Sequence, residues 1–405
     1  MSTTEEIIGL SKQYVMATYA PSIPLVRGKG ARVWDAEGKE YLDLLGGIAV
    51  LPLGHCHPRV VKAIRQQAGR LMHVSNLYYN ENQPKLAQAL VARSLNGKCF
   101  FCNSGAEANE GLIKLARLWG HDQGRYEVIT MRMSFHGRTL ATLTATGQEK
   151  VQKGFEPLPA GFAYAEFNNL DSCRAAVNDK TVAILVEAVQ GEGGILPATQ
   201  EFMRGLRALC DEKNLLLLCD EVQCGLGRTG KWFGFQHYGV DPDAFSVAKG
   251  LGNGFPIGAV VAGPKLADVF KPGHHASTFG GTPLACAAAL ETIQTMDDEQ
   301  LLENAAKMGE LLIAGLRQAL RKFSFVKEVR GLGLMLGIVC DRPCKDLENI
   351  LREMGVLALT TNNLIIRFLP PLNLTAAQAR KAIRITKAAC ALWQERLAAQ
   401  PAGVA

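Results

Sequence analysis

The sequence has 405 residues, of which 48% are hydrophobic and 20% are charged, and 44 Lys and Arg against 38 Asp and Glu give a formal net charge of +6. This composition is typical of a folded globular protein of two or three domains, and it excludes a disordered chain. The basic residues form no run of five or six, and no apolar stretch reaches the roughly 18 residues of a membrane helix. We therefore expect neither a nucleic-acid-binding arm nor a membrane anchor.

Cysteine usage indicates the cellular compartment. The 11 Cys residues are odd in number and scattered, whereas disulfide frameworks are typical of much shorter secreted domains. The start MSTTEEIIGL also lacks the basic and apolar regions of a secretory signal. We expect reduced thiols and a cytoplasmic protein. Neither the pair Cys99 and Cys102, which fits a buried strand, nor the run His55, Cys56 and His57 predicts a metal site, because structural zinc needs four converging ligands.

The first predicted elements are a hairpin and two helices. Residues 31–44 fit two short strands around the turn AEGK. Pro58 suits the first turn of a helix, and apolar residues follow it at helical spacing as far as Leu71. A second helical pattern covers about residues 83–95.

The next part of the chain alternates between apolar strands and helices. Helices are expected at residues 106–120 and 201–214, and the strands are, in order, KCFFCN, YEVITM, AILVEAV, LLLLCDE, FSVAK and GAVVAG. Near-continuous apolar strands that alternate with helices are typical of a mostly parallel sheet covered on both faces. We expect this α/β large domain to span residues 55–290.

The remaining sequence has a different pattern. We expect a long helix over residues 299–322, one long strand in VKEVRGLGLMLGIV, a helix near residues 344–354, the short strands VLALT and LIIRFL, and a closing helix from Thr375. These elements predict a smaller α+β domain over residues 291–405. Residues 1–54 are expected to pack with it, because chain ends often lie together.

Chemically useful residues follow three of the apolar strands, at the place where ligands bind in open α/β sheets. Ser104 and Gly105 open a helix whose free N–H groups suit a phosphate. Asp220 ends a buried strand and needs a partner for its charge. Lys249 stands between FSVA and the glycine-rich GLGNGFPIG, where its amine can be desolvated and become nucleophilic. Together the three features predict a pyridoxal phosphate (PLP) site.

A glycine-rich segment suggests a different cofactor. Residues 225–230, GLGRTG, match the G-x-G-x-x-G pattern of dinucleotide-binding loops. That fingerprint requires a helix directly behind the glycines and an acidic residue about 20 positions further on. The following KWFGFQHYGVDPD has no helical period, so the pattern disfavours the alternative of a nicotinamide oxidoreductase.

Six motifs resemble those of the class III PLP-dependent aminotransferases: NSGAEANE, SFHGRT, VQGEGG, DEVQCGLGRTG, FSVAKGLGNGFPIGA and STFGG. The resemblance extends from about Arg32 to Pro371, and GGIAV, LGHCHP and HVSNLYYN are most similar to the acetylornithine aminotransferase branch. It implies a fold-type I transferase, with a mostly parallel seven-stranded sheet in the large domain. It also implies a homodimer with active sites shared across the interface. A PLP enzyme that does not transaminate, such as a decarboxylase or an aminomutase, is a second alternative.

The resemblance also implies roles for the matching residues. Lys249 would hold the cofactor as an imine and move protons, Asp220 would pair with the pyridinium nitrogen, and Gln223 would bond the phenolic oxygen. The further cofactor contacts that it implies are Gly105, Ala106, Phe135, Glu221, Val222 and, from the neighbouring subunit, Thr278. The substrate contacts that it implies are Arg138, Glu192, Arg367 and, from the neighbouring subunit, Ser277.

The choice of substrate depends on three of these positions. In ornithine-type members of the family, the Glu that matches Glu192 neutralises the Arg that matches Arg367 until glutamate binds. Ile48 stands where ornithine aminotransferases usually have a Tyr for the free α-amino group, which an Ile cannot bind. These residues favour N2-acetyl-L-ornithine and 2-oxoglutarate as substrates, giving N-acetyl-L-glutamate 5-semialdehyde and L-glutamate in arginine biosynthesis. Succinylornithine, N-succinyl-diaminopimelate, ornithine and 4-aminobutyrate are alternative donors.

Overall fold

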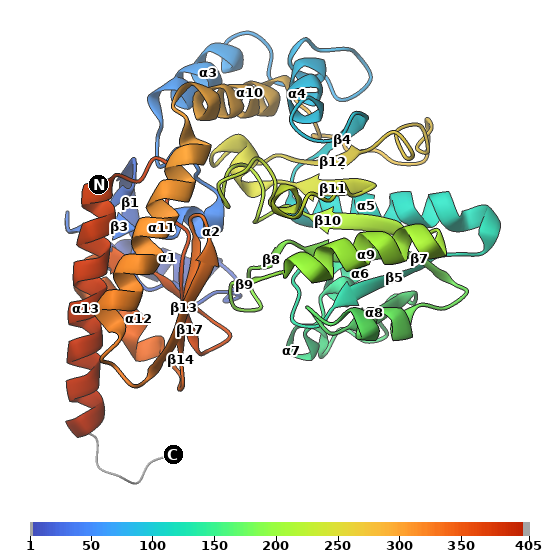
Figure 1. Ribbon diagram of the computed structural model, residues 1–405. Coiled ribbons are helices and arrows are strands. Elements are labelled where there is room, and N and C mark those ends of the chain that lie inside the picture. The colour runs from blue at the N-terminus through green and yellow to red at the C-terminus, as the bar shows by residue number, and fades with distance from the viewer. Residues whose placement is uncertain (1–2, 400–405) are drawn as a thin grey trace.

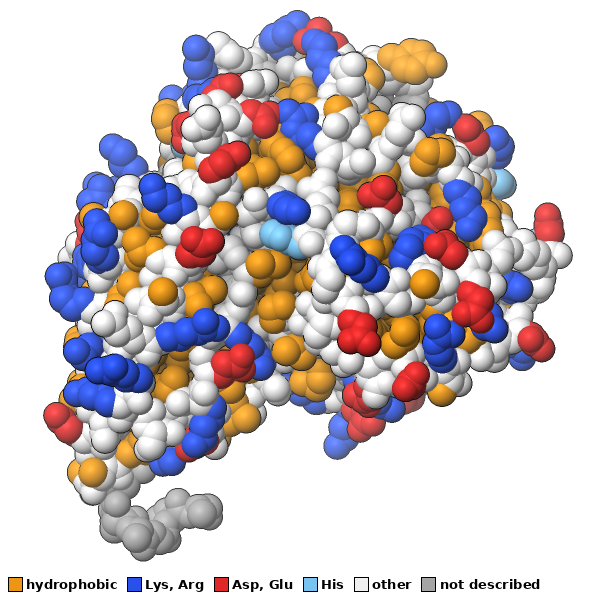
Figure 2. Space-filling view, in the orientation of Figure 1, with side chains coloured by type: hydrophobic (Ala, Val, Ile, Leu, Met, Phe, Trp, Pro, Cys, Tyr) orange, Lys and Arg blue, Asp and Glu red, His pale blue; other side chains and the backbone are white. Residues whose placement is uncertain are grey.

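The computed structural model describes residues 3–399 (Figure 1). They form a large α/β unit around one seven-stranded sheet and a smaller unit that combines both ends of the chain. On the face shown in Figure 2, Lys and Arg side chains gather along the left edge, over the smaller unit, whereas both signs of charge mix over the large unit. No helix within residues 3–399 is long and apolar enough to cross a membrane.

The central sheet has the strand order β4-β12-β11-β10-β7-β5-β6. Only β12 runs antiparallel to its neighbours, so the predicted mostly parallel α/β sheet is confirmed. Its strands are β4 (Lys98–Cys102), β5 (Glu127–Met131), β6 (Phe162–Ala165), β7 (Thr181–Glu187), β10 (Leu216–Asp220), β11 (Ala244–Val247) and β12 (Gly258–Ala262). The apolar runs do not reveal β6, because this short edge strand is only partly buried.

Successive residues of the central strands face two different hydrophobic clusters. Leu217 and Cys219 of β10 share a cluster with helix α9 (Gln200–Lys213). Leu216 of the same strand shares another cluster with helix α5 (Gly105–Gly120). Helices therefore cover both faces of the sheet (Figure 1), which explains why its inner strands are apolar without alternation.

Two elements of the smaller unit differ from the prediction. The helix expected at residues 299–322 is α11 (Leu301–Leu320), and a further helix, α10 (Pro283–Asp298), precedes it. The single long strand expected in VKEVRGLGLMLGIV is instead a hairpin of β13 (Val326–Leu332) and β14 (Met335–Cys340). Gly333 adopts φ 56° at the turn, a conformation that glycine takes without steric cost. Apolar residues continue on both sides of that turn, so the pattern alone does not reveal the reversal.

The two ends of the chain meet in one sheet. The predicted N-terminal hairpin forms β2 (Arg32–Asp35) and β3 (Glu40–Asp43), and β3 pairs in parallel with β15 (Val356–Leu357). The outer strand β1 (Leu25–Lys29) pairs with β2. This arrangement places the N-terminal hairpin against C-terminal elements, while the domain limits at residues 54 and 290 stay a prediction.

The second small sheet has the order β13-β14-β17-β16 and carries Arg367 in β17. Three helices pack with it in one hydrophobic cluster: α11, α12 (Lys345–Glu353) and α13 (Ala376–Ala399). Its other strands are β16 (Leu359–Thr361) and β17 (Ile365–Phe368). The remaining elements are α1 (Thr4–Tyr14), α2 (Gly46–Ala49), α3 (Pro58–Ala68), α4 (Asn82–Val91), η1 (His121–Gln123), α6 (Leu140–Ala145), α7 (Glu149–Gln152), α8 (Leu170–Ala176), β8 (Val189–Gln190), β9 (Leu196–Pro197), η2 (Gly234–Tyr238) and η3 (Lys249–Gly252).

Candidate active site

Asp220, the last residue of β10, lies buried at the carboxyl end of the sheet. Its Oδ2 accepts a hydrogen bond from Asn109 Nδ2 at 2.7 Å and lies 2.8 Å from His136 Nδ1. Its Oδ1 accepts a hydrogen bond from the Val222 amide at 3.0 Å. The carboxylate that needs partners by its burial therefore finds them in two other segments of the chain and in the loop that directly follows it.

Lys249 begins the 3-10 helix η3, with one residue between it and the end of β11, and adopts φ 39°, a strained conformation for a residue with a side chain. Burial lowers the pKa of its amine from 10.5, and the carboxylates of Glu192 and Asp220 oppose this effect. Because the net shift is downward, the site favours the neutral and nucleophilic form of the amine.

A cavity of about 230 Å³ opens beside these residues. It collects side chains and backbone from the loops that follow β4, β5, β8, β10 and β11. Nine residues of the predicted site line it: Gly105, Ala106, Phe135, Arg138, Glu192, Asp220, Val222, Gln223 and Lys249. The fold thus brings most of the predicted constellation together at one edge of the sheet.

The turn between β4 and α5 has the features of an anion cradle. Ser104 caps the helix by accepting a hydrogen bond from the Glu107 amide at 3.2 Å. Gly105 allows close packing here, because a Cβ at this position would lie 2.6 Å from Val222 Cγ1. The first N–H groups of a helix lack intrahelical partners, and Gly105 and Ala106 both line the cavity.

Arg367 is completely buried and donates from Nη1 to Glu192 Oε1 at 2.6 Å. Within the described residues its Nε and Nη2 atoms have no hydrogen-bond partner, and neither has the buried Oε1 of Gln223. Buried polar atoms without partners are rare in proteins because they are costly. Their presence at this site fits polar ligands that would complete the hydrogen bonds.

Four predicted site residues do not line the cavity, and one of them, Arg367, is joined to it through Glu192. Glu221 turns its carboxylate to the amides of Gly234 and Phe235, at 2.7 and 2.9 Å, so this geometry does not support a contact between its side chain and a cofactor. Ser277 and Thr278 lie in the loop between β12 and α10, and neither lines the cavity of its own chain.

Sequence reasoning missed Glu187, which ends β7 in register with Asp220 and lines the cavity. Burial, and then the charge of Asp220, raises its pKa well above the ordinary value. The available signal was an acidic residue at the end of a fully buried strand, the same signal that revealed Asp220. Asn109 and His136 gave no such signal, because they approach Asp220 only in the folded chain.

The glycine-rich residues 225–230 do not form a dinucleotide-binding loop. They make turns that lead into the short 3-10 helix η2 and not into an α-helix. The fingerprint therefore lacks the helix N-terminus that would receive a pyrophosphate.

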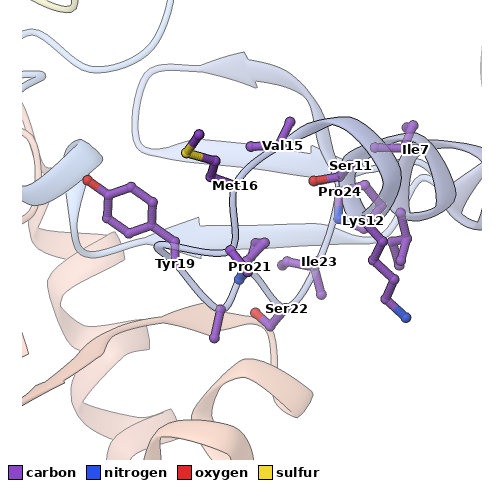
Figure 3. Close-up of a pocket in the computed structure, with 13 residues that line it drawn as sticks. Ile7, Ser11, Lys12, Val15, Met16, Tyr19, Pro21, Ser22, Ile23 and Pro24 are labelled. Carbon is purple, nitrogen blue, oxygen red and sulfur yellow. The ribbon is translucent and has the colours of Figure 1, made fainter.

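A larger cavity, of about 680 Å³, lies between α1 and residues 15–24 (Figure 3). Its walls are mostly apolar, with Ile7, Val15, Met16 and Pro21 among them, and Lys12 is the single charged side chain in them. Without converging polar groups this cavity offers no catalytic constellation.

Residues 14–390 match the family model for class III aminotransferases. The chain belongs to the class III aminotransferase family. It is 50% identical over 386 residues to an acetylornithine aminotransferase from Caldanaerobacter subterraneus, which covers 94% of this chain and 98% of that protein. The fold matches an ornithine aminotransferase from Toxoplasma gondii, in a structure with partial occupancy of PLP, with a TM-score of 0.94 and 34% identity over 98% and 96% of the two chains. It matches an N-acetylornithine aminotransferase from Stenotrophomonas maltophilia with a TM-score of 0.83 and 36% identity over 96% and 100%.

Membership of the class III aminotransferases confirms the family that the motifs resembled and makes the chain an enzyme of amino-group transfer. The family depends on PLP, and the α/β architecture is the predicted one. The alternative of a nicotinamide oxidoreductase is therefore wrong. The roles of individual site residues stay predictions.

Proposed function

We propose that this class III aminotransferase moves the terminal amino group of N2-acetyl-L-ornithine to 2-oxoglutarate, giving N-acetyl-L-glutamate 5-semialdehyde and L-glutamate. The observation that carries the proposal is the ion pair of Glu192 with the buried Arg367 beside the cavity that contains Lys249. The 50% identity to an acetylornithine aminotransferase supports the donor. This reaction belongs to arginine biosynthesis, and the free cysteines support a cytoplasmic location.

The residues around the cavity fit PLP. The amides of Gly105 and Ala106 would donate to the phosphate, Asp220 would face the ring nitrogen, and Gln223 would donate from Nε2 to the phenolic oxygen. Phe135 supplies an aromatic ring at the same cavity. When bound, PLP supplies an aldehyde that takes up the amino group and a ring that delocalises the electrons released when a proton is removed.

Lys249 would hold the cofactor and move a proton at Nζ in each half-reaction. Because burial lowers the pKa of this amine below 10.5, a larger fraction of it is neutral and able to act as a base than for an exposed lysine. Asp220 would keep the ring nitrogen protonated through its negative charge. Asn109 and His136 support that role, because they hold the Asp220 carboxylate in one orientation.

Two arginines would separate the two substrates. Arg138 lines the cavity, with its guanidinium carbon 5.5 Å from the centre of the Phe135 ring, and would bind the α-carboxylate of the acylated donor. Glu192 keeps Arg367 neutralised during that half-reaction. Glutamate would then displace Glu192 and bind the planar guanidinium of Arg367 through two parallel hydrogen bonds.

Ile48 stands where ornithine aminotransferases usually have a Tyr, and it favours a donor whose α-amino group is acylated. Ile48 packs, half-buried, against the main hydrophobic cluster of the large unit and offers no side-chain hydrogen bond to a free α-amino group. Ile48 does not line the cavity, so it supports an acylated donor only through its match to that Tyr position: an acylated amine carries no charge and needs no partner there. This supports an acylated donor over free ornithine.

The proposal includes a homodimer with shared active sites. Leu77, Tyr78, Tyr79 and Phe279 are large apolar side chains that are 62% to 106% exposed. Hydrogen bonds from residue 76 hold this segment beside the loop that carries Thr278. An exposed apolar patch of this kind marks an interaction surface, and a second subunit seated there would receive Thr278 in its own active site.

A screen of single half-reactions tests the proposal. The holoenzyme is mixed with N-acetylornithine, N-succinylornithine, N-succinyl-diaminopimelate, ornithine or 4-aminobutyrate, and the loss of the absorption of the lysine-bound cofactor is followed. We expect N-acetylornithine to give the highest second-order rate constant among these donors. Glutamate should act as the partner substrate. The Lys249→Ala variant should bind PLP without turnover. A faster reaction with another donor, or the absence of any reaction with glutamate, would overturn the proposed activity.

A further inference from the structure

A row of carboxamides holds the loop that carries Ser277 and Thr278. Residues 263–282 connect β12 to α10 without a helix or a strand. Side-chain amides from residues 76–83 donate to carbonyl groups near the end of this loop and at the start of α10. We call these four side chains the amide clasp: Asn76, Asn80, Asn82 and Gln83.

Asn76 makes the contacts of the clasp that matter most for the turn 277–280. Its Nδ2 donates to the carbonyl oxygens of Ser277 and Gly280, both at 3.0 Å, so one amide group joins the two ends of the turn. Gln83 Nε2 donates to Asn76 Oδ1 at 2.8 Å. This hydrogen bond orients the Asn76 amide so that its nitrogen, and not its oxygen, faces the turn.

The turn is also held from the other side. Ser277 Oγ accepts hydrogen bonds from the Gly280 amide at 3.0 Å and from Asn103 Nδ2 at 3.3 Å. A Cβ at Gly280 would lie 2.1 Å from the Phe101 carbonyl oxygen, so the backbone is pressed against β4. Thr278 is exposed, with no side-chain hydrogen bond to the described residues. The turn is therefore fixed at its base and presents its tip to a neighbour.

We propose that Asn76 is a positioning residue for the shared active site: its carboxamide holds the 277–280 turn in the shape that presents Ser277 and Thr278 to the neighbouring subunit. This inference rests on the proposed function, because it needs Thr278 to complete the phosphate site of the partner copy. Asn76 itself acts through the turn and touches neither substrate nor cofactor in the proposed assignment.

The Asn76→Asp substitution removes the hydrogen-bond donor of this side chain while keeping nearly the same size and shape. A carboxylate has nearly the size of the carboxamide but cannot donate to the two carbonyl oxygens. Losing both hydrogen bonds, at roughly 1 kcal/mol each, should weaken the affinity of the dimer for PLP by about tenfold or more. The measurement is a titration of the apoenzyme with PLP, followed by absorption and independent of turnover.

A matched control and a second variant keep the test sharp. Asn96→Asp makes the same change of charge at an exposed position outside the clasp and should leave the affinity for PLP unchanged. Gln83→Glu removes the donor that orients Asn76 and should weaken PLP binding less than Asn76→Asp does. If Asn76→Asp does not fold, Gln83→Glu still decides, and an unchanged affinity in that variant would overturn the inference.

Mixed dimers test whether Asn76 acts across the interface. In a dimer of one Asn76→Asp chain and one Lys249→Ala chain, the site that keeps Lys249 receives Ser277 and Thr278 from the chain with an intact Asn76. We expect that site to bind PLP with native affinity. A site as weak as in the Asn76→Asp homodimer would mean that Asn76 only supports the fold of its own chain.

The Thr278→Ala variant distinguishes failure of this inference from failure of the proposed shared site. If Thr278→Ala binds PLP normally, the shared phosphate site is wrong, whatever Asn76→Asp does. If Thr278→Ala weakens binding but Asn76→Asp does not, only the positioning role of Asn76 fails.

Discussion

At the scale of single residues, burial dominates the electrostatics of the candidate site. It lowers the pKa of Lys249 and raises that of Glu187, so both groups favour their neutral forms. Neighbouring charges act second: Glu192 and Asp220 favour the charged form of the amine, whereas Asp220 disfavours the charged form of Glu187. The result is an amine near carboxylates whose neutral form is easier to reach than in water, which suits a residue that must act as nucleophile and base.

The reactivity of Lys249 should depend on pH in a defined direction. In the apoenzyme, reductive alkylation of Lys249 by a small aldehyde should reach half its maximal rate below pH 10.5, because only the neutral amine reacts and burial lowers its pKa. Glu192→Gln should move this midpoint further down, since Glu192 stabilises the charged amine. Peptide mass spectrometry against the exposed Lys150 as internal reference measures both effects. An upward shift in Glu192→Gln would contradict this electrostatic account.

The pair Glu192 and Arg367 should affect the two half-reactions in opposite ways. Glu192→Ala leaves Arg367 open to carboxylates, so glutamate should bind more tightly. The reaction with free ornithine should slow, because its α-carboxylate can then bind Arg367 and turn the wrong end of the molecule towards the cofactor. Arg367→Ala should slow the glutamate half-reaction by roughly 10²-fold, the scale of a few kcal/mol for truncating a buried charge contact. Single-turnover kinetics for each half-reaction measure these changes. Equal losses in both halves for both variants would show that the pair is only structural.

At the scale of elements, the turn of the β13–β14 hairpin joins the smaller unit to the loop that follows Gln223. The Leu334 amide donates to the Arg228 carbonyl at 3.0 Å, and Arg228 in turn donates from Nη1 to the carbonyl oxygens of Leu334 and Pro370. Arg228 is buried, and this burial lowers its pKa to about 9. One main-chain hydrogen bond and the Arg228 side chain thus tie the hairpin turn, and the segment just after the strand of Arg367, to this loop of the large unit.

Gly333→Ala should disturb this contact more than an equivalent change elsewhere. A Cβ at Gly333 would lie 2.5 Å from the carbonyl carbon of Thr229, whereas Gly124, which also has positive φ, has open space around it. Gly124→Ala should therefore lower the free energy of unfolding by only about 1 kcal/mol, the conformational cost of positive φ. Gly333→Ala should lower it by about 3 kcal/mol. Urea unfolding of the two variants measures the difference. Equal losses would mean that the turn moves away without cost.

At the scale of the whole molecule, segments that are distant in sequence combine in both units. The N-terminal hairpin pairs with β15, and the cavity draws on five loops of the large unit. The exposed apolar side chains of residues 77–79 and of Phe279 remain uncovered in the single chain. Thr278 lies next to them, outside the cavity of its own chain. The single chain therefore leaves uncovered a surface that a second copy would bury.

Mixed dimers of Lys249→Ala and Thr278→Ala chains should recover activity that both homodimers lack. One site of each hybrid would contain a native Lys249 from one chain and a native Thr278 from the other. We expect about a quarter of native activity after random subunit exchange, because half of the dimers are hybrids with one native site each. Native mass spectrometry, which separates the two homodimers and the hybrid by mass, confirms the exchange. Homodimers of Thr278→Ala with native activity would contradict the shared site.

Local features of the sequence reveal much of this architecture. Unbroken apolar runs predict six strands of the central sheet, because strands covered on both faces have no polar alternation. The residues at strand ends, Gly105, Asp220 and Lys249, lead to the correct cavity for the same reason: parallel strands end at one edge. Motifs reveal the family because they combine these positions in one order.

Contacts between distant segments decide the rest. The turn at Gly333, the edge strand β6 and the hydrogen bonds of Asn109 and His136 to Asp220 depend on packing that no local pattern encodes. The direction of the Glu221 side chain also depends on such contacts, because the amides of Gly234 and Phe235 bind its carboxylate and keep it away from the cavity. Which strands are buried and which charged residues end them can be recognised from local patterns along the chain. How each charge is paired depends on the folded arrangement, because a hydrogen bond needs both partners in place.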